Sequence, residues 1–204
     1  MPRLLIATCL TISLAVAPGC ESGGKHAARL SSKELGSAVL QTSDLPKGYE
    51  RFDFGRQTRL DAHAGPRADA TRFDRQDGWK ARYRSDPAQK SGSAIVESRV
   101  DVFADAAGAK RDLRAYAEEF AAAKTQGWRI LPDVPAIGDD SRGATLVQGP
   151  AQRALRTYTI AWRDGRATAS ITIVGFGRST SLDDVVGFAR RQQARLDRAL
   201  STRQ

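Results

Sequence analysis

The segment from Leu155 to Gly175 constrains the fold more than any other part of this 204-residue chain. Apolar side chains alternate with polar or small ones in two runs, Leu155 to Arg163 and Arg166 to Gly175. Such a period of two is typical of a strand with one buried face. Asp164-Gly165 separates the runs and favours a two-residue hairpin turn, because both central residues must tolerate positive φ. The segment therefore predicts an antiparallel β-hairpin.

A second hairpin is expected earlier in the chain. Trp79, Ala81 and Tyr83 alternate with basic residues, and the alternation resumes over Ala94 to Phe103. Shorter strands are predicted at Tyr49 to Phe54, Trp128 to Leu131 and Ala144 to Gln148. The region from Gly55 to Gly78 shows no sustained periodicity, and we expect it to be a loosely packed loop rather than a binding lid.

Three helices are predicted from their caps and apolar stripes. The first starts at Ser31 or Ser32 and runs to about Thr42, and the last starts at Ser181, with Asp184 completing an approximate capping box. Asp105 caps the longest helix, which Gly127 ends. Its Tyr116 and Phe120 are expected to be core residues rather than a ligand platform.

These elements predict an α+β fold, with a mainly antiparallel sheet and about three helices packed on one face. The other face of the sheet would remain partly exposed. Trp79, Trp128 or Trp162 would line a groove there if strand parity turns the side chain outward.

The N-terminus has the pattern of an export signal. A short cationic start precedes an apolar run from Leu4 to Val16, which is too short to span a bilayer. We expect residues 1–19 to be a signal peptide, cleaved between Gly19 and Cys20. Residues 20–30 would form the lipidated N-terminus and a flexible tether, and residues 31–204 a single α+β extracytoplasmic domain.

The end of this leader, Ala17-Pro18-Gly19-Cys20, resembles the lipobox of bacterial lipoproteins. The resemblance implies that Cys20 is acylated, becomes the mature N-terminus and holds the protein to the outer side of a cell membrane. An ordinary secretory signal cleaved nearby, or an uncleaved anchor, is the alternative. Cys9 would leave with the leader, so no thiol would remain for a disulfide or metal site.

Basic residues exceed acidic ones, and the formal net charge is +9. The densest cluster lies in the last predicted helix and contains Arg190, Arg191, Arg195 and Arg198. These arginines form either a solvated helix face or a contact for anionic lipid headgroups or envelope polymers. Nucleic acid is not an expected partner, since an exported protein rarely meets it and aromatic residues for base stacking are not interleaved.

Catalytic residues are scarce in the sequence. Outside the leader the histidines are His26 in the tether and His63 in the irregular segment, and no motif for a nucleophile, metal or cofactor is present. We therefore predict a non-catalytic lipoprotein that binds a ligand, an envelope polymer or a partner protein. The alternative is a hydrolase or transferase acting on envelope material through His63 or the Asp139/Asp140 pair.

One further motif bears on the kind of domain. The first helix is followed by the turn Asp44-Leu45-Pro46-Lys47-Gly48-Tyr49. This combination resembles small extracytoplasmic domains of lipoproteins and sensor-like modules in high-GC bacteria. The resemblance implies a sensor or accessory role.

Overall fold

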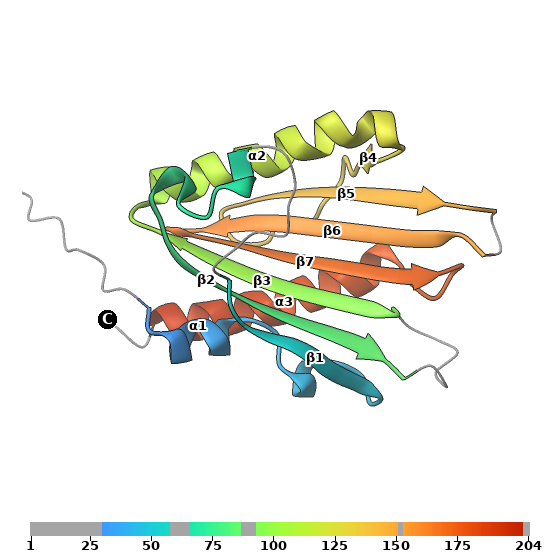
Figure 1. Cartoon of the computed structure of the whole chain (residues 1–204), viewed down its shortest axis with the longest axis horizontal. Coiled ribbons are helices and arrows are strands. Elements are labelled where there is room, and N and C mark those ends of the chain that lie inside the picture. The colour runs from blue at the N-terminus through green and yellow to red at the C-terminus, as the bar shows by residue number, and fades with distance from the viewer. Residues whose placement is uncertain (1–29, 58–65, 87–92, 151–152, 202–204) are drawn as a thin grey trace, which may run out of the picture.

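One antiparallel sheet of seven strands, in the order β1-β2-β3-β7-β6-β5-β4, organises the molecule (Figure 1). The computed structural model describes residues 30–57, 66–86, 93–150 and 153–201. The strands are β1 (Tyr49–Arg56), β2 (Arg75–Ser85), β3 (Ile95–Phe103), β4 (Arg129–Ile130), β5 (Asp140–Gln148), β6 (Leu155–Asp164) and β7 (Ala167–Phe176). The α-helices are α1 (Ser32–Ala38), α2 (Ala106–Ala122) and α3 (Leu182–Ser201).

Both predicted hairpins are confirmed. Strands β6 and β7 pair directly, with Ile160 opposite Ile171. Their turn lies one residue later than predicted, because Asp164 pairs with Ala167 and the two central residues are Gly165 and Arg166. Gly165 has a φ of 53°, and Arg166 does not have a positive φ. Strands β2 and β3 pair in the same antiparallel manner. Because β3 also pairs with β7, the two hairpins join in the middle of the sheet.

The predicted helix starts are also confirmed. Ser31 and Glu34 form a reciprocal capping box, as do Ser181 and Asp184, while the Asp105 carboxylate accepts a hydrogen bond from the backbone of Gly108 at 2.7 Å. These caps satisfy amides that lack a partner within the helix. Local sequence therefore fixed where each helix begins.

The first helix ends at Ala38, four residues earlier than predicted. Beyond it, Val39 has an extended backbone, and Leu40 lies in the core, where other elements hold its backbone. Its amide donates to the Ser98 hydroxyl at 3.0 Å, and its carbonyl accepts from the Tyr83 hydroxyl at 2.6 Å. These tertiary hydrogen bonds replace the helical ones.

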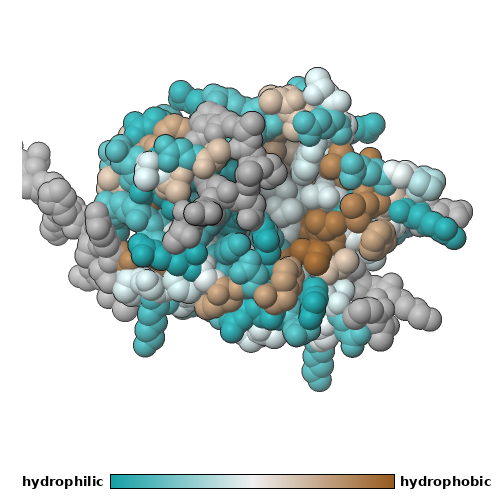
Figure 2. Space-filling model, in the orientation of Figure 1, coloured by the Kyte–Doolittle hydropathy of each residue, from teal (hydrophilic) through white to brown (hydrophobic). Residues whose placement is uncertain are grey.

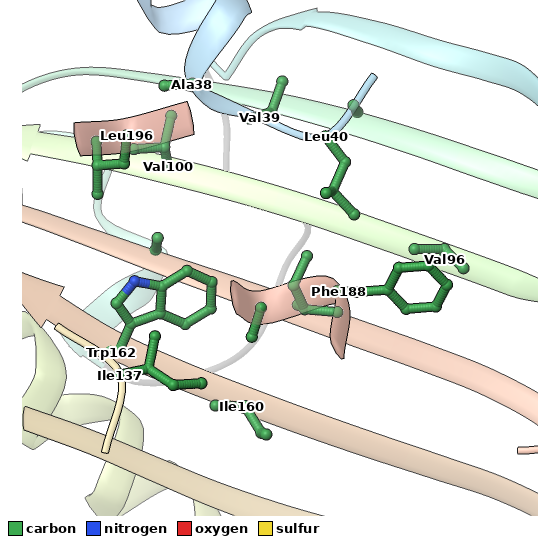
Figure 3. Close-up of a cluster of buried hydrophobic side chains, with 14 of the residues drawn as sticks. Ala38, Val39, Leu40, Val96, Val100, Ile137, Ile160, Trp162, Phe188 and Leu196 are labelled. Atoms are coloured by element: carbon green, nitrogen blue, oxygen red, sulfur yellow. The ribbon is translucent and has the colours of Figure 1, made fainter. Parts of the chain in front are cut away.

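The main apolar core lies between the sheet and helices α1 and α3 (Figure 3). Its fully buried side chains include Leu35, Val39, Leu40, Val96, Ile160, Trp162, Ile171, Ile173 and Leu196. Gln192 is buried among them and has a partner for each polar atom: its Nε2 donates to the Arg99 carbonyl at 2.7 Å, and its Oε1 accepts from the Ser98 hydroxyl at 2.8 Å. Burial of this polar group is tolerated because it has these partners.

Helix α2 lies on the opposite face of the sheet (Figure 1). The predicted α+β class, with an antiparallel sheet and three helices, is confirmed, but the expectation that the helices share one face is wrong. Leu113, Tyr116 and Phe120 of α2 pack on Ala144 and Ala161, whereas Trp162, the next residue in β6, belongs to the other face. Small side chains on this second face leave room for a helix, which gives the sheet a layer on each side.

Candidate ligand-binding cleft

The face of the sheet that carries α2 is only partly covered, and a cleft of about 700 Å³ lies between α2 and strands β2, β3, β6 and β7. Figure 2 shows this side of the molecule. The cleft is lined by Arg67, Arg82, Glu97, Arg99, Tyr116, Glu118, Glu119, Phe120, Ala122, Ala123, Gln126, Trp128, Thr157, Thr159, Ser170 and Thr172.

Hydroxyl groups form the floor of the cleft. Strand period places Ser170 and Thr172 of β7 on this face, while the intervening Ile171 enters the main core. Thr159 pairs with Thr172 across the strands, and their hydroxyl oxygens lie 3.0 Å apart. Tyr116 of α2 donates to the Ser170 hydroxyl at 3.0 Å, which ties the helix to the floor.

On β1, β2 and β3, charged side chains occupy the same face of the sheet as the cleft. Asp53 pairs with Lys80 at 2.8 Å and with Arg82 at 3.8 Å. Glu97 then pairs with both Arg82 and Arg99. Cross-strand pairs of opposite charge are favourable in antiparallel sheets, and here they form a ladder that reaches the cleft.

Arg67 reaches the cleft from the irregular segment between β1 and β2. Its Nε lies 3.3 Å from Asp112 and its Nη1 lies 3.2 Å from Glu119, both on α2. Its guanidinium carbon also lies 3.3 Å from the centre of the Tyr116 ring. The side chain is only 9% exposed, so the expectation of a loosely packed loop is wrong for this part of Gly55 to Gly78. Residues 58–65 of that segment, which include His63, lie outside the described residues.

Behind Arg67, a buried ion-pair cluster fixes the same segment. Arg72 pairs with Asp112 at 2.7 Å and with Asp101 at 3.2 Å, and Arg75 pairs with Asp101 at 2.6 Å. Asp112 also accepts from the Thr168 hydroxyl at 2.7 Å. Buried charges of this kind are stable only when they are paired and hydrogen-bonded, and the cluster meets both conditions.

The surroundings hold these groups in defined protonation states. Burial by itself would raise the pKa of the Asp101 carboxyl, but Arg75 and Arg72 outweigh it and lower that pKa below its ordinary value. Burial raises the pKa of the Tyr116 phenol, so this hydroxyl remains a hydrogen-bond donor at neutral pH. For Arg67, burial opposes the charged form, yet its acidic neighbours raise the guanidinium pKa overall.

Aromatic rings form one wall of the cleft. Phe120 and Trp128 stack with their ring planes 16° apart and their centroids separated by 6.4 Å. Phe120 is buried and Trp128 is half-buried. Tyr116 and Phe120 are thus core residues, as predicted, and they line the cleft as well. Of the three tryptophans considered for a groove, Trp128 lines it, whereas Trp162 is buried in the main core and Trp79 packs against that core.

The basic cluster of the last helix lies away from the cleft. Arg190, Arg191, Arg195 and Arg198 are on α3, which covers the other face of the sheet. Arg195 forms an ion pair with Asp44, and Arg191 donates to the Asp44 backbone carbonyl at 3.2 Å. Arg190 and Arg198 are exposed. The helix therefore uses part of its basic cluster to hold the turn before β1.

The other residues singled out in the sequence do not join the cleft. Asp139 pairs with Arg163 at 2.6 Å, and Asp140 pairs with Arg142. Gly19 and Cys20, together with His26, lie outside the described residues. Within the described ranges, no group of three or more His, Cys, Asp or Glu side chains could hold a metal ion.

Sequence reasoning missed Arg67, Arg82, Glu97, Arg99 and Glu119 as cleft residues. The polar positions of β2 and β3 were recognised only as the outward half of an alternating pattern. Alternation tells which residues share a face, but it does not tell whether a helix stands beside that face. For Arg67 the sequence carried no periodic signal at all.

The comparisons with known proteins show a similarity of fold. No protein-family model matches the chain, and no curated protein matches it. The structure is similar to the extracellular domain of PknH from Mycobacterium tuberculosis, with a TM-score of 0.58 and 8% sequence identity, over 82% of this chain and 98% of that one. None of the helices in the described ranges is long and apolar enough to cross a membrane. The chain thus shares its fold with a domain that is extracellular in its own protein.

Proposed function

We propose that this chain is a non-catalytic, membrane-anchored lipoprotein whose extracytoplasmic domain binds a ligand in the cleft between α2 and the sheet. The cleft itself is the observation that carries the proposal. Its volume of about 700 Å³ falls within the usual range of ligand pockets, and aromatic and polar side chains converge on it, as in such pockets generally. A protein that binds a ligand in the envelope without transforming it would act as a sensor or as an accessory protein.

The state of the acidic groups supports binding rather than catalysis. Glu97 pairs with Arg82 and Arg99, and Glu119 pairs with Arg67. These ion pairs hold the carboxylate side chains in fixed orientations. These groups are better placed to orient a ligand than to transfer its protons.

The sequence of the leader supports the membrane anchor, and the extracellular origin of the similar PknH domain supports the location. Metabolic labelling with a palmitate analogue tests the anchor. We expect the wild-type protein to be labelled and Cys20→Ala to remain unlabelled. Equal labelling of the two would exclude acylation at Cys20.

Binding in the cleft is tested with a filled variant. Thr172→Trp places a large side chain on the cleft floor, whereas Val147→Trp changes an exposed residue outside the cleft lining. Both changes are made in the full chain carrying Cys20→Ala, and a fragment library of neutral, acidic and basic small molecules is screened by NMR. We expect hits to shift resonances of cleft residues, to be lost in Thr172→Trp and to persist in Val147→Trp. Hits that survive Thr172→Trp would refute the cleft as the binding site.

A further inference from the structure

We infer that the ligand is a neutral saccharide, held through its hydroxyl groups by Arg67 and Glu119 and through a ring face by the aromatic wall. This inference rests on the proposed function and narrows it to one chemical class. Three features of the cleft support it: two buried polar atoms without partners, a balance of charge, and the combination of hydroxyl and aromatic surfaces.

The buried polar atoms lie on the ion pair between the irregular segment and α2. Arg67 and Glu119 contact each other through Nη1 and Oε2 at 3.2 Å. Arg67 Nη2 and Glu119 Oε1 are also buried, and neither has a hydrogen-bond partner among the described residues. Buried polar atoms are nearly always satisfied, by protein, by ordered water or by ligand. One is a donor and the other an acceptor, and both residues line the cleft.

A hydroxyl group can satisfy either atom, because it can accept a hydrogen bond from Arg67 Nη2 or donate one to Glu119 Oε1. A carboxylate or phosphate can accept from Arg67, but it has no proton for Glu119 and would lie close to its negative charge. An ammonium group can donate to Glu119, but it cannot accept from Arg67 and would lie close to its positive charge. The pair therefore selects a group that is neutral and bifunctional.

The balance of charge over the whole lining of the cleft leads to the same class of ligand. The lining includes three arginines, Arg67, Arg82 and Arg99, and three glutamates, Glu97, Glu118 and Glu119. All three arginines lie in ion pairs with acidic side chains. An anionic ligand would meet arginines whose charges are already compensated, and would lose its hydration without gaining a free counter-charge. The cleft is thus suited to a neutral molecule with many hydrogen-bonding groups.

The other surfaces of the cleft match a sugar ring. Thr157, Thr159, Ser170 and Thr172 offer hydroxyl groups along the floor. Trp128 is half-buried in the wall and is stacked with Phe120. A pyranose or furanose ring has polar edges and a face of C–H groups, so it can contact an aromatic side chain and the hydroxyl floor at the same time. Envelope glycans carry this chemistry.

The test uses calorimetric titration of the full chain carrying Cys20→Ala. The probes are neutral oligosaccharides of glucose, mannose, galactose and arabinose, with a glucuronate-containing oligosaccharide and palmitate as acidic and apolar counterparts. We expect one or more neutral oligosaccharides to bind and the counterparts to bind at least about tenfold more weakly.

Variants assign the binding to the named residues. Trp128→Ala removes the ring contact, and Glu119→Gln replaces the acceptor Oε1 with an amide donor while it preserves the shape of the side chain. Each is expected to weaken saccharide binding by about tenfold. Trp79→Phe is the matched control, since Trp79 packs against the main core on the other side of the sheet, and it should leave binding unchanged.

The outcomes separate this inference from the proposed function. If only the acidic oligosaccharide or palmitate binds, and Thr172→Trp abolishes that binding, the cleft is a binding site for another class and the saccharide inference is wrong. If a neutral saccharide binds equally to wild type, Trp128→Ala and Glu119→Gln, the assignment to these residues is wrong. If no probe binds and the fragment screen also fails, the proposed function fails with it.

Discussion

The two faces of the sheet differ in what their residues do. The face beneath α1 and α3 is apolar and closely packed, with Trp162, Ile171 and Leu196 fully buried. The face beneath α2 carries threonines, a buried ion-pair cluster and a cleft. Alternate residues of the same strands serve both, so one sequence pattern supplies the apolar core on one side and the polar site on the other. The comparison predicts effects of different size and kind for neighbouring positions.

The largest loss of stability is expected on the polar face, at Asp112. This carboxylate has no exposed side-chain surface and pairs with Arg72 and Arg67. Asp112→Ala leaves two buried arginines with one partner fewer, so it should lower the free energy of unfolding by about 3–5 kcal/mol. Denaturant titration measures the change, with the exposed Asp183→Ala as a control within about 0.5 kcal/mol. A loss below 1 kcal/mol for Asp112→Ala would contradict the structural role of the cluster.

Substitutions at two adjacent residues of β7 compare directly how much each face contributes to the free energy of unfolding. Ile171 enters the main core, and Ile171→Ala should cost about 2–5 kcal/mol of unfolding free energy because it leaves a cavity. Thr172 faces the cleft, and Thr172→Ala should cost only about 1 kcal/mol through loss of its hydroxyl contact with Thr159. The same denaturant titration checks both variants. Equal losses would show that the cleft floor is packed like the main core.

The buried carboxylate of Asp101, on the polar face, should also make the stability of the fold depend on pH. The pKa of Asp101 is lower in the folded protein than the ordinary value of about 3.9, so its pairing stabilises the fold above that value and is lost as the pH falls through the folded pKa. Unfolding free energy should therefore decrease below about pH 4. In Asp101→Asn this decrease should be shallower, by up to about 1.4 kcal/mol per pH unit. Parallel pH profiles for the two proteins would refute the contribution of Asp101.

The smallest effect is expected on the outer side of α3. Arg190 is exposed there, and Arg190→Gln should weaken association with phosphatidylglycerol vesicles by about 1 kcal/mol at low salt and by less at high salt. Vesicle sedimentation of the full chain carrying Cys20→Ala measures the contribution of Arg190 to vesicle association separately from that of the lipid anchor. Arg114→Gln, on the exposed side of α2, is the matched control. If both variants lose the same affinity, net charge rather than the α3 surface causes the attraction.

Helix starts, hairpins and the main core were predictable because their signals are local. Ser31 and Glu34 are three residues apart, and Gly165 supplies the positive φ in the turn between β6 and β7. The alternation in β6 likewise places Ile160 and Trp162 on one face, and the structure buries both in the main core. In each case the interacting groups lie within one element or in adjacent ones, so spacing along the chain is enough.

The cleft could not be predicted in the same way. Arg67 and Glu119 meet across 52 positions of sequence, and nothing near Arg67 indicates that meeting. Arg67 is one of many basic residues in the chain, and it stands in a segment without periodicity. Its role depends on where α2 packs, which is a property of the assembled sheet.

By itself, the sequence determined the class of fold, the two hairpins, the starts of the helices and which residues of a strand share a face, because backbone geometry repeats every two or 3.6 residues. Only the tertiary structure decided the strand order, the position of α2 on the second face and the joining of Arg67, Glu119, Trp128 and the threonine floor into one cleft. Those features come from packing between segments far apart in the chain. The long-range arrangement of the sheet, rather than any local motif, therefore created the candidate site.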